Sequence, residues 1–260
     1  MISRESEKQQ PQENGSTTNF GYRKIAVEEK AGYVLRHFNS IAGRYDLMNT
    51  LLSLGIHYLW KRKAVKMTGL KYGGLAIDVC GGTGDLSVRA AKVMGRRGRV
   101  ILYDINLSML ENGLPKIKKA SMEQQIQCVQ GDAESLSFPD DFFDAAMIGF
   151  GIRNVTDMEQ CLREIHRVLK PGGRFMCLEF SIPAPSWFRL LYDFYSFRIM
   201  PVLGKMIAGT REAYLHLPES IRMFPLPDVF RRMVEEAGFD DVSYRRLTNG
   251  IAVVYTGVKK

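Results

Sequence analysis

A chain of 260 residues, with 45% hydrophobic and 25% charged residues, can bury a full core as one large domain with appendages. No apolar run reaches the ~18 residues that a membrane-spanning helix needs, and the first twenty residues lack the apolar centre of a signal peptide. We therefore expect a cytoplasmic protein. The four cysteines show neither C-x-x-C spacing nor a histidine cluster, so we expect no metal site and no disulfide framework.

Residues 1–26 are polar and predict a disordered tail. From 27 to 72 the sequence predicts a helical prelude, because apolar residues such as Val34, Phe38 and Ile41 recur at spacings of three and four. The net charge of +8 is concentrated here, with seven Lys/Arg against one acid between residues 31 and 74. Such a stretch is either a solvated basic face or a surface for anionic lipids or nucleic acid.

From residue 73 to residue 260 short apolar runs alternate with helical patterns. Strands are expected at residues 75–80, 99–105, 126–132, 143–151 and 174–181. The segments between them predict helices at residues 85–94, 107–120 and 157–169. This alternation is typical of an α/β fold with a mostly parallel sheet covered on both faces.

The alternation is interrupted at about 183–225 by an aromatic and Met-rich helical insertion. A further helix is expected at 226–239, followed by two strands joined through Thr248, Asn249 and Gly250. Because Asn-Gly is a frequent hairpin turn pair, we expect the sheet to end in an antiparallel hairpin.

The turn after the first strand, in "LAIDVCGGTGDLS", is rich in glycine. Gly82 and Gly84 permit unusual backbone dihedrals and leave room for a ligand, with Thr83 between them. A dinucleotide site needs G-x-G-x-x-G, but the third glycine position is occupied by Ser87. Asp78 would repel a pyrophosphate but can pair with a cationic amino acid group. These two features favour S-adenosylmethionine (SAM) over a dinucleotide.

Two further acids follow the second and third strands. Asp104 is placed to accept the ribose hydroxyls of either ligand class. Asp132 is placed to accept from an adenine amino group, and the Ala133 backbone N–H can donate to the ring. An alternative for Asp132 is a helix N-cap.

Several motifs resemble a known family. "IDVCGGTGDLS", "DAESLSFPDDFFD" and "LREIHRVLKPGGR" are similar to class I SAM-dependent methyltransferases. "GRYDLMNTLLSLGIHYLWKR", "FGIRNVTD", "YDFYSFRIMPVLGKMIAG" and "YLHLPESIRMFP" resemble the ubiquinone/menaquinone C-methyltransferases of the UbiE/MenG type. The resemblance implies a Rossmann-like, mostly parallel seven-stranded sheet and a SAM-dependent transfer of methyl to a ring carbon of a polyprenylated quinol. Demethylmenaquinol would become menaquinol, and 2-polyprenyl-6-methoxy-1,4-benzoquinol is a further substrate of such enzymes.

Carried over from the family, the SAM contacts are Thr83, Asp104, Asp132 and Ala133. The chain departs from the family pattern at Gly149, where many members have serine. It departs again in "AGTREAY", at Thr210 and Ala213.

Arg153, in "GIRNV" just after the fourth strand, is our candidate for stabilising a quinol phenolate, with Asn154 as its orienting partner. A structural arginine bonded to a backbone carbonyl is the alternative. Lesser candidates for the proton acceptor are five side chains, His57, Tyr45, Tyr192, Asp193 and Tyr195.

A polyprenylated substrate is membrane-borne, so we expect peripheral contact with the inner face of a membrane through the basic prelude and the insertion. Five insertion residues are candidates to line an apolar path, with core packing as the alternative: Trp187, Phe188, Phe194, Phe197 and Met200. A homodimer or a quinone-synthesis assembly is a further expected partner, and nucleic acid is not. The rival interpretations are a methyltransferase of another small molecule, an RNA-modifying protein, and a SAM-binding protein without catalysis.

Overall fold

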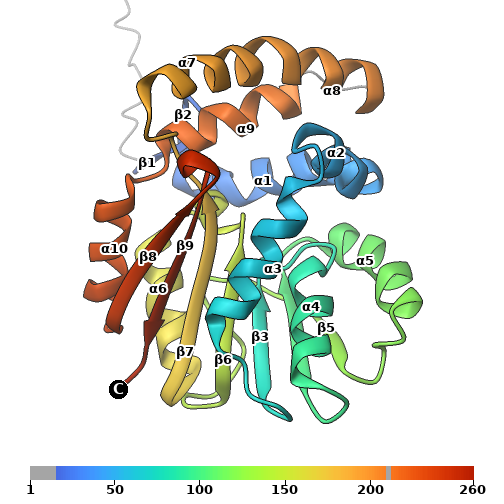
Figure 1. Ribbon diagram of the computed structural model, residues 1–260, viewed down its shortest axis with the longest axis vertical. Coiled ribbons are helices and arrows are strands. Elements are labelled where there is room, and N and C mark those ends of the chain that lie inside the picture. The colour runs from blue at the N-terminus through green and yellow to red at the C-terminus, as the bar shows by residue number, and fades with distance from the viewer. Residues whose placement is uncertain (1–15, 209–211) are drawn as a thin grey trace, which may run out of the picture.

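The computed structural model describes residues 16–208 and 212–260. A seven-stranded sheet carries helices on both faces, and a layer of further helices covers one end of it (Figure 1). This is the α/β architecture that the alternation of strands and helices predicts.

The sheet has the strand order β5-β4-β3-β6-β7-β9-β8. Its members are β3 (Leu75–Val79), β4 (Arg99–Asp104), β5 (Ile126–Gln130), β6 (Phe143–Gly149), β7 (Leu169–Phe180), β8 (Asp240–Leu247) and β9 (Ala252–Val258). The first five strands are parallel, whereas β9 is antiparallel to both β7 and β8. The predicted antiparallel C-terminal hairpin is therefore confirmed.

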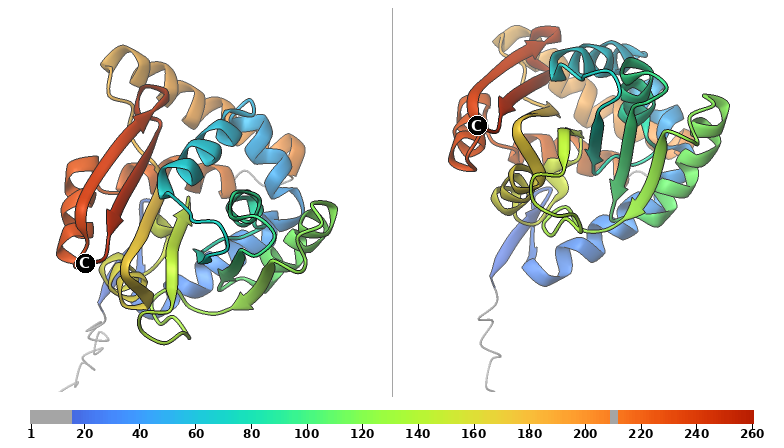
Figure 2. Two further views of the ribbon diagram at one scale, coloured as in Figure 1. Left: turned by 60° about the horizontal axis from the view of Figure 1, so that its bottom comes forward. Right: turned by 90° about the horizontal axis from the view of Figure 1, so that it is seen from below.

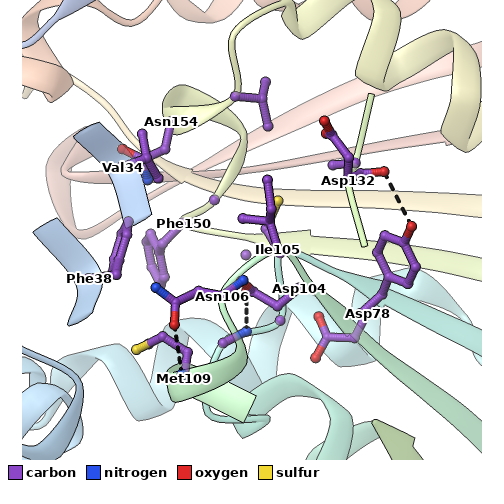
Figure 3. A pocket seen from close by; sticks show the side chains of 18 of the residues that line it. Val34, Phe38, Asp78, Asp104, Ile105, Asn106, Met109, Asp132, Phe150 and Asn154 are labelled. Carbon is purple, nitrogen blue, oxygen red and sulfur yellow. Dashed lines mark hydrogen bonds between the residues drawn. The ribbon is translucent and has the colours of Figure 1, made fainter. Parts of the chain in front are cut away.

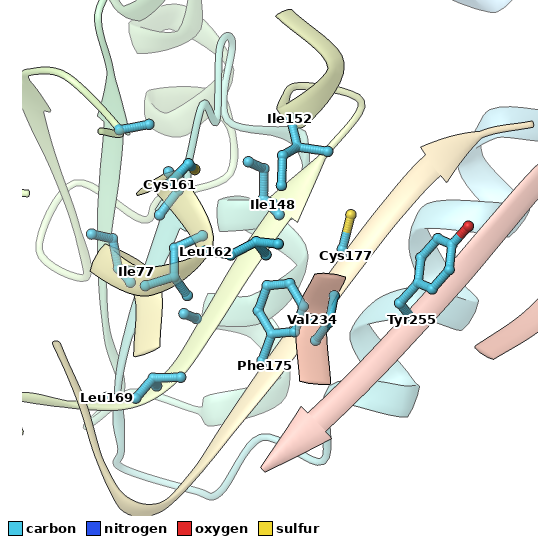
Figure 4. Close-up of a cluster of buried hydrophobic side chains, with 14 of the residues drawn as sticks. Ile77, Ile148, Ile152, Cys161, Leu162, Leu169, Phe175, Cys177, Val234 and Tyr255 are labelled. Atoms are coloured by element: carbon cyan, nitrogen blue, oxygen red, sulfur yellow. The ribbon is translucent and has the colours of Figure 1, made fainter. Parts of the chain in front are cut away.

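Alternation along the strands divides the core between the two faces of the sheet. Ile77 and Val79 of β3 pack with α6 (Met158–Val168) and α10 (Pro227–Glu236), and Figure 4 shows part of this cluster. Ala76 points to the opposite face, which is covered by α3 (Ile56–Thr68), α4 (Asp85–Met94) and α5 (Leu107–Lys119). Because both faces are covered, the central strands are apolar throughout.

The helical prelude is present as α1 (Val27–Ile41), a short 3-10 turn at Ala42–Arg44, α2 (Tyr45–Leu52) and α3. The helices of the prelude pack in different places. Trp60, Ala64 and Val65 of α3 are buried in the core of the sheet, whereas α1 and α2 lie across the sheet end (Figure 1). The prelude is thus partly a core element and partly a cap.

The prediction of a disordered tail through residue 26 is wrong for its last ten residues. β1 (Thr17–Phe20) and β2 (Arg23–Ala26) form an antiparallel hairpin. The hairpin is anchored by Phe20, which stacks on the ring of His216 with a centroid distance of 3.9 Å. One aromatic side chain in a polar stretch gives no periodic signal, so the sequence pattern could not reveal this contact. Residues 1–15 lie outside the described residues.

The insertion forms α7 (Ser186–Phe194), a π-helical turn at Tyr195–Ile199, α8 (Met200–Ala208) and α9 (Glu212–Met223). It lies over α2, to which it is bonded by Tyr195 Oη donating to the Leu52 carbonyl at 2.8 Å. Figure 2 shows from two further sides how these helices and α1 enclose the sheet end. None of the helices in residues 16–208 and 212–260 combines the length and apolar character needed to cross a bilayer.

Candidate active site

The glycine turn is shaped by its bonds to the neighbouring strand. Gly82 and Gly84 both have positive φ, +56° and +78°, in the left-handed region that glycine tolerates. The Gly82 N–H donates to Asp104 Oδ2 at 2.8 Å, which holds the turn against the end of β4. Gly84 caps α4 and does not line the adjoining cavity, so its contribution is to the shape of the turn.

A cavity of about 290 Å³ lies at the carboxyl ends of the parallel strands; we name it the cofactor cavity (Figure 3). It brings together seven of the nine residues that the sequence selected for SAM binding or for stabilising the quinol phenolate. These are Asp78, Gly82, Thr83, Asp104, Asp132, Ala133 and Asn154. The wall opposite the strands comes from α1, through Val27, Ala31, Val34 and Phe38, a contribution that the sequence pattern did not assign.

Asp78 is fully buried at the base of the cofactor cavity. Its Oδ2 accepts from the Ser87 N–H at 2.9 Å and the Ser87 hydroxyl at 2.6 Å. Its Oδ1 is buried and has no hydrogen-bond partner in the described part of the chain. Burial raises the pKa of this carboxyl to about 7. A buried acceptor of this kind fits a cationic group, such as the amino group of SAM.

Asp104 and Asp132 lie along the cavity in the order predicted for a nucleoside (Figure 3). Asp104 accepts one backbone N–H on each oxygen, from Gly82 and Asn106, and burial raises its pKa. Each oxygen retains a lone pair for a ribose hydroxyl. Asp132 Oδ1 accepts from the Glu134 N–H at 2.9 Å, which makes a local turn rather than the helix N-cap considered as the alternative.

Thr83 differs from the simple ligand contact that the family resemblance implies. Its hydroxyl donates to Asp46 Oδ1 at 2.7 Å and accepts from Lys116 Nζ at 2.9 Å. Lys116 also pairs with Asp85, which in turn pairs with the buried Lys61. This network ties α2 to the start of α4, and both of its bonds to Thr83 engage the hydroxyl of a residue that lines the cofactor cavity.

A second, mostly apolar cavity of about 370 Å³ adjoins the first; we name it the apolar cavity. The two share lining residues from four elements, namely Phe38, Tyr45, Lys61, Phe150 and Asn154. Phe150 has φ of +58°, an uncommon conformation for a side chain with a Cβ, and faces Phe38 between the cavities (Figure 3). The apolar cavity extends from there to the α2–α3 turn and to α7.

Arg153 lies in the wall of the apolar cavity and is held by three contacts. Nη1 donates to the Phe150 carbonyl at 2.6 Å and to Glu179 Oε1 at 2.7 Å, and Nε donates to Ser220 Oγ at 3.3 Å. Nη2 makes no hydrogen bond within residues 16–208 and 212–260. Arg153 therefore has the backbone contact of the structural alternative and also a donor left for a substrate oxygen.

The expected partnership of Arg153 with Asn154 is replaced by an ion pair with Glu179. The Asn154 side chain instead lies where the two cavities meet (Figure 3). Glu179 is fully buried at the end of β7, and burial raises its pKa. An acid that ends an apolar strand, in "RFMCLEFS", is the sequence signal that would have identified it.

The lesser candidates separate into two groups. His57, Tyr45, Tyr192 and Tyr195 line the apolar cavity, whereas Asp193 forms an ion pair with Arg222 and lies outside the lining. Of the five residues proposed for an apolar path, two line this cavity, Phe188 and Met200. Trp187 and Phe194 are exposed, and the Phe197 ring lies beneath the Arg222 guanidinium.

Of the positions that depart from the family pattern, Gly149 lies within the described residues. At Gly149 an added Cβ would lie 2.5 Å from Leu86 Cδ1, so a serine there requires Leu86 to move. Thr210 lies outside the described residues, as does the side chain of Ala213.

Comparison with known proteins fixes the family. The sequence model of the ubiE/COQ5 methyltransferase family matches residues 24–259. The chain belongs to this family. It is 46% identical over 243 residues to the ubiquinone/menaquinone biosynthesis C-methyltransferase UbiE of Marinomonas sp. (strain MWYL1), covering 94% of this chain and 97% of the relative. UbiE of Yersinia pestis bv. Antiqua (strain Antiqua) is similar to the same extent, at 46% identity with the same coverage.

The fold comparison agrees with this assignment. A SAM-dependent methyltransferase from Aquifex aeolicus superposes with a TM-score of 0.59 at 17% identity, over 83% of this chain and 98% of that one. The predicted class I SAM methyltransferase fold and the SAM cofactor are thus confirmed, and the chain is a SAM-dependent C-methyltransferase. The buried Oδ1 of Asp78, together with the carboxylates of Asp104 and Asp132, supplies groups suited to that cofactor.

Proposed function

We propose that the protein methylates a ring carbon of a polyprenylated quinol, converting demethylmenaquinol to menaquinol. 2-Polyprenyl-6-methoxy-1,4-benzoquinol is the second candidate substrate, because the relatives are named for both ubiquinone and menaquinone biosynthesis. The observation that carries the proposal is the apolar cavity, which meets the cofactor cavity at Phe150 and Asn154 and has Arg153 in its wall. Its size is within the range of small-molecule sites, and its lining suits a hydrophobic ring with a prenyl chain.

Aromatic side chains give the apolar cavity a wall suited to a flat ring. Trp60, Phe150 and Phe180 all line it, with centroid distances of 4.3 Å between the two phenylalanines and 6.0 Å between Trp60 and Phe180. Stacking against such a wall orients an aromatic acceptor. Bound SAM supplies an electrophilic methyl group, so the chain has to position the ring and increase its nucleophilicity.

Arg153 is suited to increase the nucleophilicity of the ring. A quinol ring carbon becomes a good nucleophile when the neighbouring hydroxyl is ionised, and a fixed guanidinium donor stabilises that phenolate. Glu179 and the Phe150 carbonyl hold Nη1, so little reorganisation is needed when Nη2 donates to the ring oxygen. Asn154, between the cavities, is placed to bind the ring edge next to the reacting carbon.

The test combines cells and purified protein. The gene is expressed in a strain that lacks quinol C-methylation, and the quinones are identified by mass spectrometry. We expect menaquinone to be restored. In vitro, Arg153→Ala should reduce kcat by about 100-fold while SAM still binds, because one oxyanion donor contributes on that order.

Outcomes of this test distinguish the rival interpretations. If neither quinol is methylated in cells or in vitro, the proposal is wrong and a different small-molecule acceptor has to be sought. Restoration of ubiquinone alone would assign the benzoquinol as substrate. Unchanged turnover by Arg153→Ala would remove the role assigned to the guanidinium.

We also propose that the protein docks on the inner face of an anionic membrane through α2, the α2–α3 turn, α7 and α8. These segments carry exposed apolar side chains beside the apolar cavity, namely Leu47, Leu51, Leu54, Trp187, Leu190, Leu191, Phe194, Val202 and Met206. Arg189, Arg198 and Lys205 are exposed on the same helical segment. Apolar groups flanked by cations favour an anionic lipid surface.

Liposome co-sedimentation tests the docking. Binding should rise with anionic lipid, fall with salt, and weaken in Leu190→Glu, whose leucine is 72% exposed on α7. Leu114→Glu is the matched control, since Leu114 is 51% exposed on α5. Equal binding by both variants, or indifference to salt and lipid charge, contradicts the docking. A homodimer or quinone-synthesis assembly, and the lack of a nucleic-acid partner, stay predictions.

A further inference from the structure

His216 lines the apolar cavity but has no role in the reaction steps described above. It lies on α9, 9% exposed, with its ring stacked on Phe20 and 4.8 Å from the ring centroid of His37. Neither ring nitrogen makes a hydrogen bond to the residues that the structure describes. Because the ring contacts of this imidazole are aromatic, its nitrogens are available to exchange a proton with a ligand or a water molecule in the adjoining cavity.

His216 borders both the apolar cavity and a third, small cavity. This third cavity of about 110 Å³ has Arg153, Asn154 and His216 in common with the apolar cavity. Five polar side chains contribute to its lining, Thr18, Asn19, Lys30, Thr156 and Ser220, so we name it the polar cavity. It is large enough for several water molecules.

The orientation of the ring agrees with a position between two compartments. Nδ1 lies 3.1 Å from the point that a Cβ on Gly21 would occupy, and Gly21 lines the polar cavity. One nitrogen of the imidazole is therefore next to the polar cavity, while the residue also borders the apolar one.

Burial, and to a lesser extent the charges around it, favour the neutral form of His216. Burial, with smaller contributions from four neighbours, lowers its pKa to about 3; these neighbours are His37, Arg153, Lys30 and Arg23. A neutral imidazole can accept a proton, and the neighbouring cations then favour its release.

We propose that His216 accepts the proton that leaves the ring carbon after methyl transfer and passes it to water in the polar cavity; this rests on the proposed quinol C-methylation. The ring carbon forms a bond to the methyl group, whose former bonding pair stays on sulfur. The C–H bond at that carbon then breaks, its electron pair restores the aromatic ring, and the proton goes to His216. The phenolate oxygen regains a proton, so one proton is released per methyl transferred.

A weak base is sufficient for this step because loss of the proton restores aromaticity. Arg153 is not suited to it, since guanidinium stays protonated. His57 borders the apolar cavity near the α2–α3 turn, where its Nε2 lies 3.3 Å from Thr50 Oγ1, and it does not line the polar cavity. His216 is the histidine that borders both.

The test uses His216→Gln with a quinol deuterated at the acceptor carbon. We expect kcat to fall about 100-fold, a typical contribution of general base catalysis, and KM to fall by the same factor, so that kcat/KM stays unchanged. Because proton loss follows the irreversible methyl transfer, a primary isotope effect should appear on kcat and not on kcat/KM. A burst of one equivalent of S-adenosylhomocysteine should precede slow turnover. Wild type should show neither burst nor isotope effect.

His166→Gln is the matched control. His166 lies on α6, packs against Phe239 and lines neither the apolar nor the polar cavity, so this variant should behave as wild type. His216→Asn, and imidazole rescue of His216→Ala, serve if the glutamine variant is unstable. Wild-type kcat in the His216 variants without an isotope effect overturns the inference. Failure of wild type to methylate a quinol overturns the proposed function instead.

Discussion

The carboxyl group of Asp78 has opposite effects on the stability of the free protein and on SAM binding. Burial raises its pKa from 3.8 to about 7. At 1.36 kcal/mol per pKa unit, keeping it ionised at pH 8 costs the folded protein about 4 kcal/mol. Between these two pKa values the folded chain holds a proton that the unfolded chain has released. The free energy of unfolding therefore decreases as pH rises through this window.

Asp78→Asn removes the ionisation but retains an oxygen for the two bonds from Ser87. We expect the ligand-free variant at pH 8 to be more stable than wild type by about 2–4 kcal/mol, since its buried amide N–H₂ still lacks a partner. SAM binding should weaken about 10- to 100-fold, because a hydrogen bond between charged groups contributes about 1.5–3 kcal/mol.

Urea unfolding at pH 5 and pH 8 measures the first effect, and isothermal titration calorimetry measures the second. Asp85→Asn is the control of opposite sign. Burial raises the pKa of Asp85, but Lys61 and Lys116 outweigh it and hold the pKa well below the usual range. Asp85 therefore stabilises the protein at pH 8, and its replacement should destabilise it. An Asp78→Asn protein that is less stable than wild type at pH 8, and binds SAM normally, would refute the reasoning.

Two further substitutions test the packing around the site. In Gly113→Ala the new Cβ would lie 2.9–3.2 Å from backbone atoms of Thr83; overpacking should cost about 1–3 kcal/mol and weaken SAM binding, and calorimetric values equal to wild type would contradict this. Glu179→Ala leaves the Arg153 guanidinium unpaired in a buried site and should lower the free energy of unfolding by about 3–5 kcal/mol. Adding Arg153→Met should restore much of the stability but not turnover; recovery of turnover would show that Arg153 is only structural.

The parts of the fold that the sequence predicted well are those with a local signal. The strand ending at Val79, the glycines after it and the acid at Asp104 follow one another at spacings set by a strand–turn–helix unit. Their proximity in space follows from parallel strands that end at one edge. For the same reason, the sequence alone predicts that Asp78 and Asp132 share one cavity, and no information about long-range contacts is needed.

The parts that it missed depend on contacts between distant segments. Phe20 and His216 are stacked in the structure but are separated by most of the chain. Glu179 joins Arg153 only because β6 and β7 are neighbours in the sheet. The Thr83 hydroxyl is occupied by Asp46, from a helix whose place over the turn no periodicity defines. Pairing of this kind is fixed by tertiary packing.

Helix α1 lines both of the large cavities, through Val27, Ala31 and Val34 on one side and His37 and Ile41 on the other. Whatever free energy is needed to hold this helix in place is therefore shared by the two ligands. The ligand that binds first bears that cost, and the second binds more tightly by the same amount. Reciprocity requires the quinol to strengthen SAM binding by the factor with which SAM strengthens quinol binding. A single amphipathic helix thereby couples donor and acceptor affinity in addition to the contact that methyl transfer itself requires.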